Sequence, residues 1–551
     1  MPEPSDSRPP PSAHGAARVA LGILLSRLAG LVRTRVFAHA FGTSPVAGAF
    51  SAALRIPNTL QNLLGEGVLS ASFIPVYARL LGEKREEAAD RVAGAVFGLL
   101  ALTTAAGVAL GVAAAPWLAR LVAGGYAASD PASFAKTVEL TRVLFPSTGL
   151  LVMSAWCLGV LNSHRRFFLS YAAPVVWNAV QIILLVVAGG RVGEDRLATL
   201  LAWAVVGGSL LQFLIQLPSV LGLLGGLHLS LDTASSAMRT VLRNFLPVVV
   251  SRGVVQVSAL VDTFYASLIS APAVSALYYA QLIGVLPVSL FGMSVSAAEL
   301  PELSRDSGAP SGAEERLRLR LDAGLRRIAF FVVPSAVGFL ALGDVVGGLL
   351  VQTGRFGGAE TRLLWYLLVG SAVGLLAGTQ ARLYASAFYA LHDTRTPLRF
   401  ALVRVALAAG LAYLAVRSLA RWLGGPALLG CAGITAASGV AAWIEFLLLR
   451  RALGARLGRT GVGGGRLARL WAAAAFAGAV ALGSKMLLVE RFGPELSSAA
   501  TWGGWVLPAP ALHPVLTALV LVPLYGGIYL LLTPLLGVSE LSGVLTRLRR
   551  P

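Results

Sequence analysis

Residues 92–119 read VAGAVFGLLALTTAAGVALGVAAAPWLA, a run of 28 residues without a charged side chain, between Arg91 and Arg120. A helix of about 20 apolar residues crosses the hydrocarbon core of a bilayer. This run is long enough to span a membrane as a tilted helix. Because runs of this kind recur along the chain, such helices are expected to build the fold.

The composition of the 551 residues supports a polytopic membrane protein. Hydrophobic residues make up 56% of the chain, charged residues 13%, and the mean hydropathy is +0.75. Soluble domains carry about 25% charged residues, so water-soluble cores are excluded. Cys157 and Cys431 lie far apart in apolar runs, which excludes a secreted disulfide scaffold.

The apolar runs predict an all-α fold of about fourteen transmembrane helices. Residues 1–16 are expected to form a disordered cytoplasmic tail, and residues 538–551 a basic one. No cleaved signal peptide is expected, because the first helix serves as the insertion signal. The fourteen runs are 17–41, 46–78, 92–119, 137–161, 168–188, 197–224, 244–270, 273–303, 328–351, 363–390, 398–416, 426–449, 470–489 and 512–537.

Basic residues set the orientation. Of the 45 Lys and Arg residues, about 27 fall in the tails and the even-numbered connections, and about nine in the odd-numbered ones. Positively charged connections stay in the cytoplasm, so both termini are predicted to be cytoplasmic. The basic residues that give the net charge of +19 lie between apolar runs and are not clustered as they would be on one folded face. This distribution therefore indicates anionic lipid as the partner and no nucleic acid.

The remaining nine basic residues lie inside or near the ends of apolar runs. A cation in mid-membrane normally faces protein or water. We expect Arg142 and Lys485 to extend to a membrane interface, whereas the arginines of the first two helices favour a hydrated cationic cavity. The nine are Arg27, Arg33, Arg35, Arg55, Arg142, Arg252, Arg382, Arg404 and Lys485.

Acidic residues are few in the apolar runs, and two of them are taken as functional candidates. Glu66 follows Arg55 in the second run, and its structural role would be to pair with a nearby basic group. Asp262 is a candidate for a proton or cation site, or a charge partner of Arg252. Direct pairing with Arg252 within one helix is not expected, because ten residues separate them by about 15 Å.

A weak internal repeat with a shift of 227 residues predicts two similar lobes. It relates the first six helices (17–224) to the next six (244–449), in a pseudo-twofold arrangement typical of transporters. Helices 13 and 14 (470–537) fall outside it. The matches are Phe37 with Phe264, Pro45 with Pro272, Ala49 with Ala276, Ala53 with Ala280, Gly65 with Gly292, Val68 with Val295, and Pro75 with Pro301 after a one-residue slip.

Sequence signatures of an enzyme are missing. No phosphate-binding loop is present, since the nearest string, residues 478–485 (GAVALGSK), lies in an apolar run. The six histidines are scattered, and no pair has metal-ligand spacing. We therefore predict a transporter without a catalytic residue, a cofactor or a confident metal site.

Several stretches resemble the MurJ (MviN) family of lipid II flippases, within the multidrug/oligosaccharidyl-lipid/polysaccharide exporter superfamily. The pattern Pro-Asn, Glu-Gly, Ser-x-Ser-Phe in the second run is the most specific part. The similar stretches are SRLAGLVRTRVFAHAFG (26–42), AFSAALRIPNTLQNLLGEGVLSASFIPVYARL (49–80), VDTFYASLISAPAVSALYYA (261–280), ELPELS (299–304), VQTGRF (351–356) and AFYALHDTRTP (387–397).

The resemblance implies two six-helix lobes and a C-terminal helix pair that lines a groove for the lipid tail. A central cationic cavity would take the diphosphate-linked headgroup, and alternating access would carry lipid II to the outer leaflet of the bacterial cytoplasmic membrane for peptidoglycan synthesis. We expect a monomer, with membrane lipids and cell-wall synthesis proteins as further partners. Na⁺, H⁺ or the membrane potential would assist.

The family pattern assigns roles to individual residues. Arg27, Arg33 and Arg55 match basic positions of the headgroup cavity, where forked guanidinium donors suit diphosphate. Glu66 matches the Glu-Gly pair, and Pro57 and Asn58 the Pro-Asn pair; these three are expected to be structural or gating residues. Asp262 matches an acidic position linked to cation or proton coupling.

Other positions depart from the family. Asn62 stands where a second-helix arginine is expected and is assigned to the same cavity. Thr34 and Gly48 replace acidic residues, and Gln281–Leu282 replaces an acidic residue and an arginine. Arg252 is predicted to restore the cation missing at Leu282.

These departures keep alternatives open. One is a flippase for another undecaprenyl-linked glycan, and another is a non-transporting membrane scaffold of the same fold. An antiporter for cationic drugs is disfavoured by the cationic cavity. Residues 398–416 contain no Asn, Asp or Glu to complete a sodium cage, so proton or potential coupling is equally expected.

Overall fold

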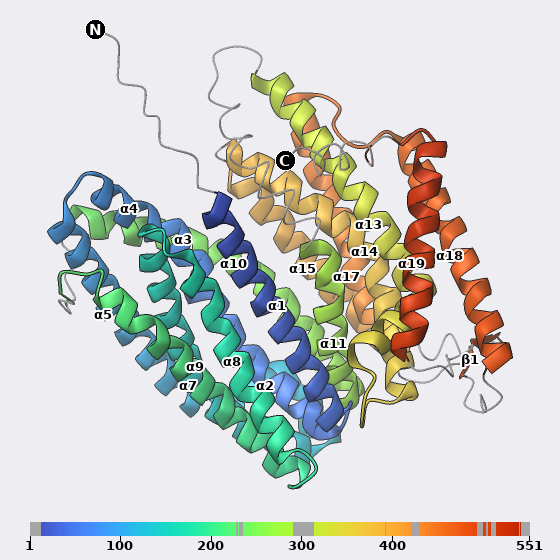
Figure 1. Cartoon of the computed structure of the whole chain (residues 1–551), viewed down its shortest axis with the longest axis horizontal. Helices are drawn as coiled ribbons and strands as arrows, with labels where there is room; N and C mark the ends of the chain where they lie inside the picture. Colours follow the sequence, from blue (N-terminus) through green and yellow to red (C-terminus); the bar gives the residue numbers. More distant parts are fainter. Residues whose placement is uncertain are drawn as a thin grey trace. The chain divides into compact units, whose positions relative to one another are not determined.

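The computed structural model describes residues 13–226, 230, 235–289, 313–391, 393–419, 429–492, 500–502, 505–507, 514–538 and 540. Nearly all of the described chain is helical, which confirms the predicted all-α membrane fold (Figure 1). Most of both predicted tails, the ELPELS stretch, and Gly292, Val295 and Pro301 of the repeat lie outside the described residues. So does the side chain of Arg252.

The first half of the chain contributes α1 (Ala13–Phe41), α2 (Pro45–Leu64), α3 (Glu66–Ser72), α4 (Ile74–Gly82), α5 (Glu86–Ala113), α6 (Ala115–Ser129), α7 (Pro131–Ser163), α8 (Phe167–Ala188), α9 (Glu194–Leu221), α10 (Ser236–Ile269) and α11 (Ala271–Pro287). The second half contributes α13 (Ala313–Val351), α14 (Gly358–Ala390), α15 (Arg395–Leu414), the π-helical turn η2 (Ala415–Leu419), α17 (Leu429–Leu457), α18 (Gly464–Phe492) and α19 (Pro514–Leu535). Two antiparallel strands, β1 (Ala500–Trp502) and β2 (Trp505–Leu507), lie between α18 and α19.

Ten helices of the described chain are long and apolar enough to cross a membrane. They match ten of the fourteen predicted runs. The other four runs correspond to α1, the α2–α4 segment, α10 and α11. The prediction of about fourteen spans therefore roughly agrees with the described helices, although the second run is interrupted and the run 92–119 divides at Ala114, between α5 and α6.

Gly65 interrupts the second run, which we had expected to form one helix over 46–78. Its backbone is not helical (φ −87°, ψ −148°), and it caps α3. A Cβ at this position would lie 2.5 Å from the Gln61 carbonyl oxygen, so only glycine fits this sharp turn. The break places Glu66 in the first turn of α3, where the helix dipole favours a carboxylate.

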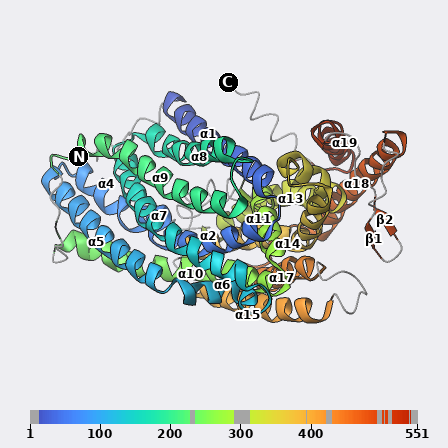
Figure 2. The ribbon, with the colours of Figure 1, turned by 90° about the horizontal axis from the view of Figure 1, so that it is seen from below.

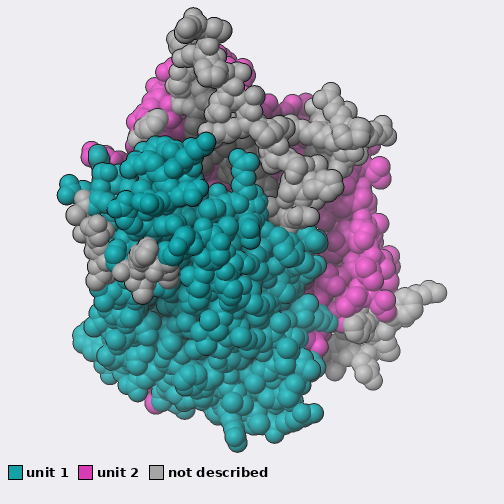
Figure 3. All heavy atoms as spheres, turned by 60° about the vertical axis from the view of Figure 1, so that its left-hand side comes forward, with its two compact units in different colours: residues 1–40, 49–122, 132–256 teal, residues 41–48, 123–131, 257–551 magenta. Residues whose placement is uncertain are grey.

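The chain divides into two compact units, coloured in Figure 3. Unit 1 comprises residues 1–40, 49–122 and 132–256, and unit 2 comprises residues 41–48, 123–131 and 257–551. The division falls within α10, between Gln256 and Val257. Each unit has its own packed interior.

The interior of unit 1 centres on α7. Most of its membrane-spanning segment is buried, and Trp156 is fully enclosed. The Trp156 indole Nε1 donates to the Ala93 carbonyl of α5 (3.1 Å), and its ring packs edge-on against Phe97 (4.8 Å). This contact satisfies the indole N–H where no water is available.

Unit 2 is built on close packing of α14 against α17. A Cβ added to Gly374 would lie 2.3 Å from the Gly439 Cα, so neither position tolerates a side chain without displacement. Small residues let helix backbones approach closely in membranes, where apolar burial supplies little driving force. Helices α13, α18 and α19 lie side by side next to this pair (Figure 2).

Helix α19 satisfies a defect in α13. Pro334 has no N–H, so the Phe330 carbonyl loses its helical partner. The Tyr529 hydroxyl donates to this carbonyl (2.6 Å), and the Tyr525 hydroxyl donates to the Pro334 carbonyl (2.7 Å). The C-terminal helix is therefore attached to unit 2 by polar contacts as well as apolar ones.

Asp393, within the AFYALHDTRTP stretch, lies two residues before the start of α15. Its Oδ1 accepts from the Thr396 N–H (3.0 Å), and its Oδ2 accepts from Arg456 (2.7 Å). Burial raises the pKa of this carboxyl, but the hydrogen bonds from Thr396 and Arg456 outweigh burial and hold the pKa below its usual value. The motif thus has a structural role at the end of a helix.

The interpretation of Lys485 as an interfacial residue was wrong. Its side chain is 1% exposed, and Nζ lies 2.5 Å from Oδ2 of Asp344, which is also buried. Nζ also lies 4.7 Å from the centre of the Trp365 ring. The pair joins α18 to α13 because a buried cation needs a nearby opposite charge.

We predict that Asp344→Ala lowers the free energy of unfolding by about 3–5 kcal/mol, because it leaves Lys485 charged and unpaired in the interior. The double variant Asp344→Leu/Lys485→Met should recover most of this loss. Thermal unfolding of the purified protein in one detergent measures both. Equal melting temperatures for Asp344→Ala and the unmodified protein would contradict the buried pair.

Candidate functional site

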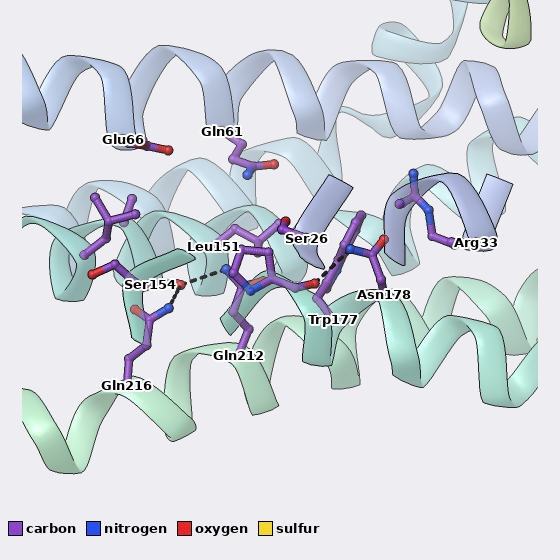
Figure 4. Close-up of a pocket in the computed structure, with 16 residues that line it drawn as sticks. Ser26, Arg33, Gln61, Glu66, Leu151, Ser154, Trp177, Asn178, Gln212 and Gln216 are labelled. Atoms are coloured by element: carbon purple, nitrogen blue, oxygen red, sulfur yellow. Dashed lines mark hydrogen bonds between the residues drawn. The ribbon is translucent and has the colours of Figure 1, made fainter. Parts of the chain in front are cut away.

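Unit 1 contains a polar cavity of about 330 Å³ (Figure 4). Side chains from α1, α2, α3, α7, α8 and α9 line it. Most of its polar groups come from helices of membrane-spanning length, so its hydrogen-bonding groups lie in an otherwise apolar setting. The lining residues are Ser26, Gly30, Arg33, Gln61, Gly65, Glu66, Leu151, Ser154, Ala155, Leu158, Ser170, Pro174, Trp177, Asn178, Gln212 and Gln216.

Arg33 provides the positive charge of this cavity. Its guanidinium carbon lies 4.8 Å from the centre of the Trp177 ring of α8. A cation over an aromatic face is attracted by the ring while its N–H donors stay available at the edge of the guanidinium. The contact therefore orients Arg33 without neutralising it.

Uncharged polar residues form much of the remaining cavity wall. Ser154 Oγ of α7 accepts from the amides of Gln212 (2.9 Å) and Gln216 (3.1 Å) of α9. Asn178 Nδ2 donates to the Pro174 carbonyl one turn earlier in α8 (2.8 Å). These contacts hold the amide side chains in place against the cavity.

Glu66 and Gln61 face the cavity from the side opposite Gln212 and Gln216 (Figure 4). Glu66 is exposed. The cavity thus has one guanidinium and one carboxylate at its margin, with amides and hydroxyls between them.

Of the predicted headgroup residues, the structure brings Arg33 together with Glu66 in this cavity. Arg27 is exposed, Arg55 is half-buried, and neither belongs to the lining. Asn62 is exposed and donates to Gln256 Oε1 of α10 (3.3 Å). Arg252 lies in α10 with no described side chain, so its predicted role stays a prediction.

The Pro-Asn pair lies in α2. Pro57 is buried, and its carbonyl accepts from the Thr148 hydroxyl of α7 (3.3 Å), whereas Asn58 is half-buried. Gly48 follows the start of α2, and a Cβ there would lie 2.2 Å from the Ala271 carbonyl oxygen. An acidic side chain at position 48 would therefore not fit this packing.

Asp262 lines a separate cavity of about 190 Å³ within unit 2. Its Oδ1 accepts from the Ser438 hydroxyl of α17 (3.0 Å). Gln281 of α11 also lines this cavity, and the neighbouring Leu282 is exposed.

Two guanidinium groups share this cavity with Asp262. Arg382 of α14 and Arg404 of α15 line it, and Arg404 Nη1 lies 3.2 Å from Glu445 Oε2. Oxygen ligands for a sodium ion are present, but the two guanidinium groups already balance the carboxylates of Asp262 and Glu445, so no net negative charge remains to hold a further cation. The residues therefore do not fit the sodium site that the resemblance implied.

The sequence analysis missed several of these residues. Trp177, Ser154, Asn178 and the two glutamines are single polar or amphipathic residues within apolar runs. Gln212 and Gln216 are four apart, a spacing that places both on one helix face. Asp344 and Glu445 are likewise single polar residues within apolar runs. Their pairing was not predicted, because their partners Lys485 and Arg404 lie far away in the sequence.

Comparison with known proteins now identifies the family. The lipid II flippase MurJ family matches residues 37–498. The chain belongs to this family. The predicted membership, including its place among membrane transporters, is thus confirmed, and the chain is a multi-pass membrane protein.

Relatives from other bacteria support the family assignment. The chain is 32% identical over 444 residues to a probable lipid II flippase MurJ of Rhizobium meliloti (strain 1021), covering 79% of each chain. It is 32% identical over 430 residues to the lipid II flippase MurJ of Burkholderia cenocepacia, covering 77% of this chain and 80% of the relative.

Solved structures share the fold. A lipid II flippase MurJ in an inward closed conformation superposes with a TM-score of 0.71 at 20% identity, covering 96% of this chain and 99% of the other. An inward-facing multidrug resistance MATE transporter of the MOP superfamily gives 0.63 at 19% identity, covering 80% and 98%.

We predict that sodium does not stabilise the protein specifically, because Arg382 and Arg404 occupy the surroundings of Asp262. A resident cation would add about 2.7 kcal/mol at 100 times its Kd. Melting temperatures should agree in sodium and N-methylglucamine chloride of equal ionic strength. Stabilisation by sodium that disappears in Asp262→Asn would contradict this prediction.

Proposed function

We propose that the chain moves lipid II, the undecaprenyl-diphosphate-linked peptidoglycan precursor, from the inner to the outer leaflet of the bacterial cytoplasmic membrane. Family membership and the names of the relatives support this substrate. The observation that carries the proposal is Arg33, oriented by Trp177 in a polar cavity of a membrane-spanning unit.

The cavity suits a charged headgroup that must leave water. The Arg33 guanidinium offers forked donors to a phosphate, and its charge acts strongly in an apolar environment. Binding of the diphosphate partly neutralises Arg33 and adds to the negative charge that the other arginines of α1 and α2 experience. This lowers their mutual repulsion and shifts the population toward the state that opens outward.

The driving force that is coupled to transport is inferred from the Asp262 cavity. Since two arginines stand beside Asp262, we assign the driving force to the membrane potential or to protons, and not to sodium. The distribution of basic residues supports a cytoplasmic location for both termini. In this scheme the protein works as a monomer, with cell-wall synthesis enzymes supplying and consuming its substrate.

The test is complementation of bacteria depleted of their own lipid II flippase. The unmodified chain should restore growth, and Arg33→Ala should not, because the oriented cation is lost. Arg33→Lys should restore growth only in part, since an ammonium lacks the forked donors. Arg27→Ala tests the remaining predicted contact from α1.

Arg142→Ala is the matched control, because Arg142 is an exposed arginine of α7 outside the cavity. It should restore growth like the unmodified chain at equal membrane levels. Rescue by Arg33→Ala would contradict the proposed site. Failure of the unmodified chain, despite normal insertion, would favour another undecaprenyl-linked glycan or a non-transporting scaffold.

A further inference from the structure

The unit 1 cavity has hydrogen-bonding groups that the protein itself does not satisfy. Within the part of the chain that the structure describes, four buried polar atoms of its lining have no hydrogen-bond partner. They are Ser170 Oγ, Trp177 Nε1, Asn178 Oδ1 and Gln216 Oε1.

Their burial makes this unusual. Ser170 and Gln216 are 1% exposed, and Asn178 is 5% exposed. More than nine-tenths of buried polar groups in proteins are paired, and an apolar surrounding makes an unpaired one costly. Four such atoms around one cavity indicate that a hydrogen-bonding group enters it.

The four atoms define the chemistry of that group. The indole Nε1 only donates, the two amide oxygens only accept, and the hydroxyl does both. Their partner must therefore carry both donors and acceptors. Two carbonyl oxygens and the nearby Glu66 disfavour a second anion, which leaves a neutral group such as an acetamido sugar with its amide and hydroxyls.

We infer that this cluster is a subsite for an acetamido sugar of the transported headgroup, next to the diphosphate contact at Arg33. The inference rests on the proposed function and deepens it. A volume of about 330 Å³ is near the lower end of small-molecule pockets, so the cavity takes one part of a large headgroup. Arg33 and this cluster thus bind different parts of one molecule.

The experiment measures the affinity of the purified protein in detergent for three lipids. These are undecaprenyl diphosphate, undecaprenyl diphosphate carrying the acetamido disaccharide without peptide, and complete lipid II. Gln216→Leu and Asn178→Leu should weaken binding of both sugar-bearing lipids about tenfold, the effect of losing one buried hydrogen bond. Their affinity for undecaprenyl diphosphate should not change, whereas Arg33→Ala should weaken all three.

A second variant tests the cavity without removing a polar group. Gly30 lines the cavity, and a Cβ added there meets nothing within 4 Å. Gly30→Leu should therefore occupy the space and exclude the sugar, while helix α1 tolerates leucine better than glycine. It remains informative if a variant of the amide cluster does not fold.

Two control variants match these changes in unit 1. Gln181→Leu removes a buried glutamine of α8 that does not line the cavity, and Gly107→Leu adds a side chain to α5 where a Cβ also meets nothing within 4 Å. Both should bind all three lipids like the unmodified protein.

Four outcomes would overturn the inference. Equal loss for all three lipids, or no loss, would show that the cluster does not read the sugar. Loss for lipid II without loss for the disaccharide lipid would assign the cluster to the peptide amides. If the unmodified protein bound none of the lipids, the proposed function itself would fail, together with its subsite.

Discussion

A polar group inside a bilayer has no water to hydrogen-bond, so it must find its partner within the protein. This constraint explains most of the polar contacts in the structure. The Phe330 carbonyl freed by Pro334 is met by Tyr529, and the indole of Trp156 reaches the Ala93 carbonyl. The buried ammonium of Lys485 is paired with Asp344. Partners often come from distant helices, which ties each unit together.

The same constraint separates structural polar groups from functional ones. Groups such as Lys485 and Asp393 have strong partners within the chain, and their roles in stability follow from those contacts. The unit 1 cavity differs, because Arg33 is oriented by an aromatic ring and several buried polar atoms beside it have no partner. Incomplete satisfaction at one place indicates where a ligand completes it.

The two polar cavities differ in charge, and this difference bears on their roles. The unit 1 cavity has one guanidinium and one carboxylate at its margin and neutral amides between them, which suits a headgroup with an anionic and a neutral part. The unit 2 cavity surrounds Asp262 with two arginines, one of them paired with Glu445. Because side chains already balance the charge of the carboxylates, a sodium ion would gain little electrostatic stabilisation there.

The sequence alone determined the class of protein, the approximate number of spanning segments and the family, because lipid demands long apolar helices and the family motifs are local. It also pointed to Arg33 and Glu66, since charges in apolar runs are rare. It did not identify the break at Gly65, the partner of Lys485, or the joining of Trp177, Ser154 and Gln216 in one cavity. Those depend on contacts between helices far apart in the chain, such as Lys485 and Asp344, 141 residues apart. Apolar periodicity does not encode which helix faces meet, so only the tertiary structure decided them.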